Sequence, residues 1–212
     1  MEKRKMIISI GRQYGSGGSE VGAKLAERLG IGFYDKNILR LNSDESVIKE
    51  SYFHLADEKA GNRLLYRVMN SLIPDQKMPS FGSDLVSADN LFRFQSEVLR
   101  KLAREESFVI MGRCAGYVLA GTEGLIRIFL YGDEDARIAR IVEKGLCTEE
   151  EAPRRVKRMD RERRDYHRYY TGQDWTDFRN YDLMLDTSKL GVDKTAELIS
   201  QYIKIHGYGE ET

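Results

Sequence analysis

A short glycine-rich segment carries the strongest chemical signal in this chain of 212 residues. Residues 11–19 read GRQYGSGGS; an apolar run at 6–10 leads into them, and a helical pattern of apolar positions follows from Ser19 to Gly30. In such a strand, loop and helix, backbone N–H groups of the loop point at an anion, and the amino end of the helix adds attraction. The segment therefore predicts a phosphate site, with a nucleotide polyphosphate as its ligand.

The loop partly matches the Walker A pattern G-x-x-x-x-G-K-[ST]. Gly17 takes the second glycine, and Ser19 takes the hydroxyl position that reaches magnesium, so Ser19 is the candidate metal ligand. Arg12 stands where the first glycine is expected, and Gly18 stands where the phosphate-binding lysine is expected. We hypothesise that Arg12 supplies the missing positive charge. The alternative is a glycine-rich turn that holds no ligand.

The elements that must position this loop alternate between strand and helix. Buried strands are expected at residues 5–10, 31–34, 108–111, 125–131 and 181–185. Helices are expected at 19–30, 37–41, 62–73, 88–104, 115–120, 133–145, 153–170 and 192–205. This alternation predicts an α/β fold with a five-stranded parallel sheet and helices on both faces. Ligands of such sheets bind at the carboxyl ends of the strands, where Asp35 follows the second strand.

Composition restricts the class of protein. Lys and Arg together number 34, as do Asp and Glu, so no overall field for binding nucleic acid is expected. An apolar content of 41% suits one globular domain, within which the polar, proline-interrupted residues 43–90 form an insert. The two cysteines, Cys114 and Cys147, favour a reducing cytoplasm. The first apolar run is too short for a signal peptide, and no run reaches membrane-spanning length.

Residues 154–168 are dense in arginine. Within them Arg161, Asp165 and Arg168 fall at i, i+4 and i+7, so they share one helical face. Guanidinium groups bind phosphate through paired, planar hydrogen bonds, which makes this face a candidate phosphate-binding surface. A solvated face of ion pairs is one alternative, and a surface that binds nucleic acid is another.

Together these segments resemble the P-loop nucleoside monophosphate kinases, and most closely the cytidylate kinase-like family. The segments that carry the resemblance are residues 8–19, 33–36, 112–113, 128–130, 137–140, 161–168 and 185–188. They occur in order along nearly the whole chain, and only about residues 43–90 lie outside the match. The resemblance implies a P-loop NTPase fold with a helical acceptor-binding insert and an arginine-rich lid at about residues 147–172.

The resemblance also implies a division of roles with ATP and Mg²⁺ as cofactors. The residues that would hold ATP are Gly15, Ser16, Gly17, Gly18 and Ser19 at the phosphates and Thr187 and Ser188 beside the adenine. Those that would hold the acceptor are Asp35, Lys36, Arg113, Arg161, Asp165 and Arg168. The catalytic charges would be Arg12, Arg113, Arg158 and Arg161, with Arg154 and Arg155 also in the lid.

The implied activity is transfer of the ATP γ-phosphate to CMP or dCMP in the cytoplasm. The partners would be small nucleotides, without nucleic acid or membrane, and the sequence is compatible with either a monomer or a homodimer. Gly18 and Met111, at positions where related kinases carry a lysine and often an acidic residue, leave a first alternative, and the divergent insert at residues 43–90 leaves a second. One is a nucleotide-binding regulator without catalysis, and the other is a P-loop kinase for another small metabolite.

Overall fold

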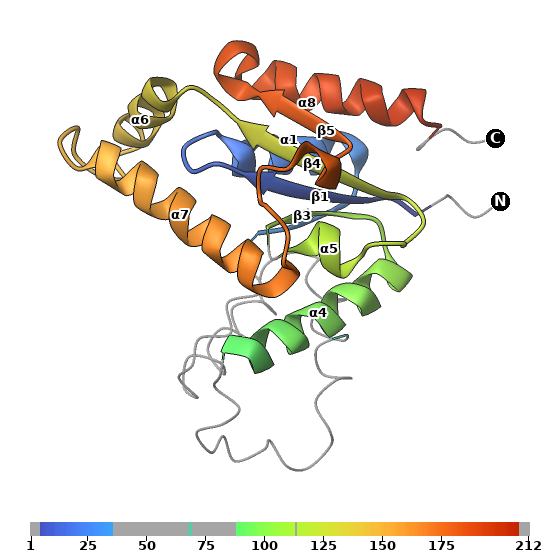
Figure 1. The fold of residues 1–212 in the computed structure, drawn as a ribbon. Coiled ribbons are helices and arrows are strands. Elements are labelled where there is room, and N and C mark those ends of the chain that lie inside the picture. Colours follow the sequence, from blue (N-terminus) through green and yellow to red (C-terminus); the bar gives the residue numbers. More distant parts are fainter. Residues whose placement is uncertain (1–4, 36–67, 69–87, 113, 208–212) are drawn as a thin grey trace.

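The computed structural model describes residues 5–35, 68, 88–112 and 114–207, and a parallel sheet forms its centre (Figure 1). The strands in this part of the chain are β1 Ile7–Arg12, β2 Gly32–Tyr34, β3 Phe108–Met111, β4 Leu125–Tyr131 and β5 Leu183–Asp186. Their order is β2-β3-β1-β4-β5, and each neighbouring pair is parallel. The predicted five-stranded parallel sheet is confirmed, with β1 in its middle.

Helices cover both faces of the sheet, as the alternation of elements predicts (Figure 1). Their bounds are α1 Gly18–Leu29, α4 Ala88–Glu105, α5 Ala115–Val118, α6 Glu134–Glu143, α7 Ala152–Thr171 and α8 Thr187–Ile205, with a short 3₁₀ turn η1 at Phe178–Asn180. Helices α1 and α8 pack on one face of the sheet. Helices α4 and α5 pack on the other. The central strand is apolar because successive side chains enter opposite cores.

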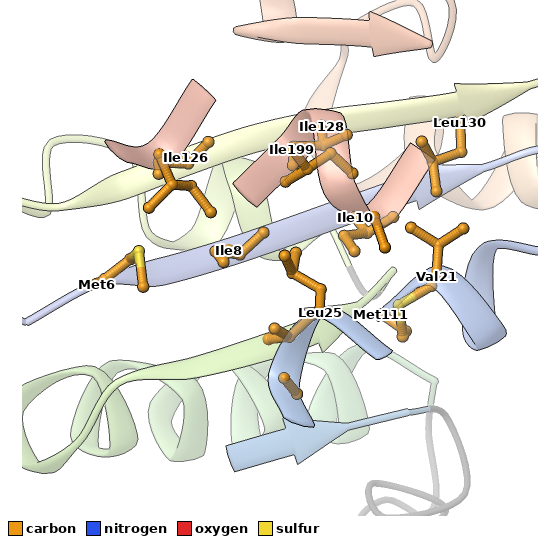
Figure 2. Packing of buried hydrophobic residues seen from close by; sticks show 14 residues of the cluster. Met6, Ile8, Ile10, Val21, Leu25, Met111, Ile126, Ile128, Leu130 and Ile199 are labelled. Carbon is orange, nitrogen blue, oxygen red and sulfur yellow. The ribbon is translucent and has the colours of Figure 1, made fainter. Parts of the chain in front are cut away.

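The apolar core between the sheet and helices α1 and α8 supports the strand that leads into the glycine loop. Figure 2 shows Ile8 and Ile10 of β1 facing Leu25 of α1 and Ile199 of α8. These side chains have no exposed surface. Burying each one stabilises the fold by roughly 1.5–3 kcal/mol relative to leaving it in water. The part of β1 that leads into the loop is thus held in place by packing against α1 and α8.

Some element bounds differ from those expected. β1 continues to Arg12, because its backbone pairs with β4 as far as Leu130. The last helix begins at Thr187 instead of 192, with a kink at Gly191, where φ is 72°. The helix expected at 37–41 and most of that expected at 62–73 lie outside the described residues, except Val68, which is buried against the α4 side of the core.

Helices α6 and α7 lie beyond the carboxyl ends of the strands, next to the glycine loop (Figure 1). A small apolar cluster of Ile141, Ala152 and Val156 joins them, with Tyr14 of the loop packed against it. Pro153 lies in the first turn of α7, where a missing N–H costs nothing, and Gly172 ends the helix at a φ of 69°. Two distant stretches of sequence are therefore brought to the same edge of the sheet.

Candidate functional site

The glycine loop lies between β1 and α1, and its glycines are required by both conformation and space. Gly15 and Gly17 have φ values of 79° and 78°, which side chains rarely tolerate. A Cβ at Gly15 would lie 2.6 Å from the Arg137 carbonyl oxygen, and one at Gly17 would lie 2.5 Å from Nη1 of Arg140. The loop lines a cavity of about 150 Å³, the loop cavity, together with Arg140 and Lys144 of the α6 region. Cationic side chains thus face the loop.

A buried ion pair fastens the loop to α6 and α7. Asp160 of α7 accepts hydrogen bonds from the backbone N–H of Tyr14 and from Nη1 of Arg137, both at 2.7 Å. The same Arg137 nitrogen donates to the Tyr14 carbonyl at 3.0 Å, and its Nε donates to the Gly132 carbonyl at 3.0 Å. Arg137 and Asp160 are 6% and 8% exposed. Both charges are satisfied, as burial requires.

Arg163, one turn beyond Asp160, reaches the end of β1. Its Nη1 donates to the Arg12 carbonyl oxygen at 2.9 Å, and its guanidinium lies 5.4 Å from the centre of the Tyr14 ring. Burial lowers the pKa of Arg163 below its ordinary value, and the nearby Asp160 opposes this shift. The side chain stays cationic, because an arginine does not lose its proton in proteins.

The end of β2 brings a carboxylate to the start of α1. The Ser19 hydroxyl donates to Oδ2 of Asp35 at 2.9 Å, and Nη2 of Arg12 donates to Oδ1 of Asp35 at 3.4 Å. A hydroxyl beside one carboxylate suits Mg²⁺, which takes few protein ligands and shares the rest with phosphate and water. The described residues contain no group of three or more His, Cys, Asp or Glu side chains that could hold a metal alone.

A second cavity of about 300 Å³ lies between the sheet, α5 and α7, and it is called the acceptor-side cavity after the role that the sequence resemblance implies for this region. Its walls are mainly aromatic and small side chains, among them Tyr117, Tyr166, Trp175 and Tyr181. Charged side chains also line it, among them Arg127 and Glu162. Two side chains, Arg12 and Arg163, line both this cavity and the loop cavity. The two spaces therefore adjoin at these two guanidinium groups.

A family model for the "Cytidylate kinase-like family" matches residues 7–189, which include every element described above except α8, of which only the first three residues are matched. The chain belongs to this family. It is 32% identical over 114 residues to a cytidylate kinase of Methanopyrus kandleri, covering 49% of this chain and 58% of that protein. It is 30% identical over 96 residues to a cytidylate kinase of Methanosarcina mazei, covering 44% and 53%. The chain thus spans a little over half the length of these relatives.

Solved structures place the cytidylate kinase-like chain in the P-loop NTPase fold. An uncharacterized protein from Eubacterium ventriosum is 30% identical, covers 94% of this chain and 99% of its own, and has a TM-score of 0.68. A gluconokinase from Sinorhizobium meliloti (TM-score 0.53, 16% identity, 99% and 100% covered) and a shikimate kinase from Acinetobacter baumannii (0.50, 17%, 97% and 96%) share the fold alone. The fold predicted by resemblance is confirmed.

The family's arginine-rich helix presents two different faces. Val156, Asp160 and Arg163 form the inner face, which packs toward the loop. Arg161, Asp165 and Arg168 do share one face, the outer face, but it is exposed and lines neither cavity. The reason is that apolar Ala152 and Val156 determine which side is buried, and the inner side continues from them through Asp160 and Arg163. That periodicity is the sequence signal that identifies Arg163.

The remaining predicted site residues are distributed as follows. Arg154 and Arg158 are exposed, whereas Nε of Arg155 donates to the Tyr14 hydroxyl at 3.1 Å. Thr187 donates to the Tyr131 carbonyl at 2.9 Å, and Ser188 lies 3.2 Å from a carboxylate oxygen of Asp133, at the start of α8 beyond β5. Lys36 and Arg113 lie outside the described residues.

Proposed function

We propose that this chain is a nucleoside monophosphate kinase that transfers the γ-phosphoryl group of ATP to a nucleoside monophosphate, with CMP or dCMP as the first candidates. The observation that carries the proposal is the meeting of two cavities at Arg12 and Arg163. One cavity is built from a phosphate-binding loop, and the other is lined by aromatic rings. This is the arrangement that an in-line transfer between two nucleotides needs.

The loop cavity is the donor side. The loop from Gly15 to Ser19 would surround the ATP phosphates, with Arg140 and Lys144 adding positive charge from α6 and its end. Ser19 and Asp35 would hold Mg²⁺, which when bound neutralises charge on the phosphate oxygens. Thr187 and Ser188 would lie beside the adenine, a role taken from the family resemblance.

The acceptor-side cavity would receive the monophosphate. Its aromatic walls, including Tyr166 and Trp175, suit a planar base, and Arg12 and Arg163 at its inner end suit a phosphate. Lys36 and Arg113 are proposed to assist there by resemblance. Arg161, Asp165 and Arg168 carry the same proposal, with α7 needing to turn its outer face inward for them to contact the acceptor.

The chemistry asks little covalent help from the protein. An oxygen of the acceptor phosphate forms a bond to the γ-phosphorus while the bond from that phosphorus to the β-bridging oxygen breaks, giving ADP and a nucleoside diphosphate. The attacking oxygen is already anionic, so no general base is required. The tasks left to the protein are alignment, charge neutralisation and exclusion of water. Arg12 and Arg163, which line both cavities, would supply the charge neutralisation.

An ADP-release assay with Mg-ATP and a panel of CMP, dCMP, UMP, AMP and GMP tests the proposal. We expect turnover with at least one monophosphate, and the fastest turnover with a cytidine nucleotide. The panel also includes phosphate-free hydroxyl acceptors such as shikimate and gluconate. Turnover with these alone would replace the proposal by a metabolite kinase, and ATP binding without turnover on any acceptor would favour a regulator.

The proposed reaction has a cytoplasmic setting. Both cysteines, Cys114 and Cys147, are free thiols, which fits a reducing compartment. In the part of the chain that the structure describes, no helix is both long and apolar enough to cross a bilayer.

A further inference from the structure

The position of the missing loop lysine is filled by a side chain from elsewhere in the chain. Gly18 occupies the place where a Walker A loop carries the lysine that reaches the β- and γ-phosphates. A Cβ built on Gly18 would lie 2.8 Å from Cγ and 3.0 Å from Cβ of Arg12. Real Cβ atoms do not approach other atoms so closely without displacing them. The stem of Arg12 therefore passes directly over the site from which a lysine would emerge.

The tip of the same side chain lies against a second glycine. A Cβ on Gly112, at the end of β3, would lie 2.4 Å from Nη1 of Arg12, and Gly112 also has a φ of 71°. On its other side the guanidinium pairs with Asp35, with Nη2 and Oδ1 3.4 Å apart. Arg12 thus lies across the carboxyl ends of β1, β3 and β2, and both glycines beside it leave space for it.

The location of the Arg12 charge fits that of a residue which contacts the transferred group. Its side chain is 11% exposed and lines both the loop cavity and the acceptor-side cavity. Ser19, the neighbour of Gly18, shares the carboxylate of Asp35 with it. A planar guanidinium here can contact two phosphate oxygens at once, whereas a lysine offers a single point of charge.

We propose that Arg12 takes the place of the P-loop lysine, with its charge delivered from the end of strand β1 instead of from the first turn of α1. Arg12 and Gly18 form an exchanged pair in which the cation moves six positions earlier and the lysine position becomes glycine to make room. This inference rests on the proposed function, because it gives Arg12 a role on the phosphates of ATP. A purely structural role, as the counter-ion of Asp35, is the competing account.

An exchange experiment separates the two accounts. The variants are Arg12→Ala, Gly18→Lys and the double variant Arg12→Ala with Gly18→Lys; Arg100→Ala, exposed on α4, is the matched control. Binding of a non-hydrolysable ATP analogue and of adenosine is measured by calorimetry, and kcat is measured with the best acceptor of the wild type. Thermal unfolding of each variant shows whether it is folded.

If Arg12 replaces the lysine, Arg12→Ala lowers kcat/KM for ATP by about 100-fold, the usual loss for one group that stabilises the transition state. Adenosine binding falls far less, because adenosine has no phosphate group. Gly18→Lys alone is also impaired, since Arg12 blocks the new side chain. The double variant recovers at least about tenfold over Arg12→Ala, because the cation returns by the usual route. Arg100→Ala matches the wild type.

Two results would overturn the inference. One is a folded Arg12→Ala protein within threefold of the wild type in both ATP-analogue affinity and kcat/KM. The other is a double variant no better than the product of the two single effects. Wild-type protein that binds the ATP analogue but turns over no acceptor refutes the proposed function alone, and analogue affinities of the variants then decide the role of Arg12. Wild-type protein that does not bind the analogue refutes both.

Discussion

The inner and outer faces of α7 are both rich in charge, yet they have different surroundings. On the inner face Asp160 is 8% exposed and bonded to Tyr14 and Arg137, and Arg163 donates to the end of β1. On the outer face Arg161, Asp165 and Arg168 are all exposed. Charge density alone therefore does not locate a site. A site is located by charged side chains that are buried beside the glycine loop.

The comparison is tested most severely by removing the inner carboxylate. Asp160→Ala leaves Arg137 buried without its partner, so we expect the free energy of unfolding to fall by about 3–5 kcal/mol. The matched outer-face change, Arg161→Ala, is expected to alter it by less than about 0.5 kcal/mol. Urea denaturation measures both. If Asp160→Ala does not fold, Asp160→Asn, which keeps the acceptor for Tyr14, is measured instead. Equal losses on the two faces would contradict the distinction.

The next test compares two arginines of the same helix in catalysis. Arg163→Ala removes a guanidinium that lines both cavities, and we expect kcat/KM to fall by about 100-fold. Arg168→Ala, on the exposed outer face, is expected to lower it by about tenfold or less. Steady-state assays with saturating ATP and varied acceptor give both values. A larger loss for Arg168 would show that the outer face turns inward during the reaction.

A smaller effect is expected from pH on the inner side of α7. His167 lines the acceptor-side cavity, and its Nε2 is buried without a hydrogen-bond partner among the described residues. Burial lowers the pKa of His167, against the opposing charge of Asp174. The folded protein therefore binds this proton less readily than the unfolded chain does. Stability should decrease as the pH falls through the ordinary histidine value of about 6.5 and be constant above it.

Replacing this histidine isolates its contribution. His167→Gln should flatten that part of the stability curve measured by urea denaturation between about pH 5.5 and 7.5. An unchanged slope in the variant would assign the pH dependence to other groups.

The smallest effect is expected for an exposed ion pair of the same helix. Arg158 and Glu162 are one turn apart and 3.8 Å from each other, but both are largely exposed to water. Arg158→Ala should change the free energy of unfolding by less than about 0.5 kcal/mol, because solvent and salt screen such pairs. Denaturation at low and high salt measures the change. A loss above about 1 kcal/mol would mean that this pair is packed against something in solution.

Much of the fold is predictable from the sequence because its signals are local. The apolar run of β3, the largely apolar run of β4 and the glycine that ends α1 determine strands and helix ends within a few residues. The glycine loop is predictable for the same reason, since its conformation depends on residues adjacent in sequence. The end of β1 was predicted less accurately. The strand continues to Arg12 because its backbone pairs with β4, which is distant in sequence.

The contacts around the loop could not be predicted in this way. Asp160 and Arg137 are 23 residues apart on separate helices, and no spacing rule connects them. The spacing of Arg161, Asp165 and Arg168 indicates a shared face but not whether that face is buried. The contact of Arg12 with Gly18 depends on how a strand and a helix approach each other in space. These contacts between residues that are distant in sequence are determined by how the elements pack against one another.

Following the phosphorus atoms directly tests the central claim, that a phosphoryl group moves between the two cavities that meet at Arg12 and Arg163. Phosphorus NMR of the protein with Mg-ATP and CMP should show the signals of ADP and CDP growing together at equal rates, with the growth slowed strongly in Arg163→Ala. Unchanged ATP and CMP signals, or inorganic phosphate in place of CDP, would contradict the account.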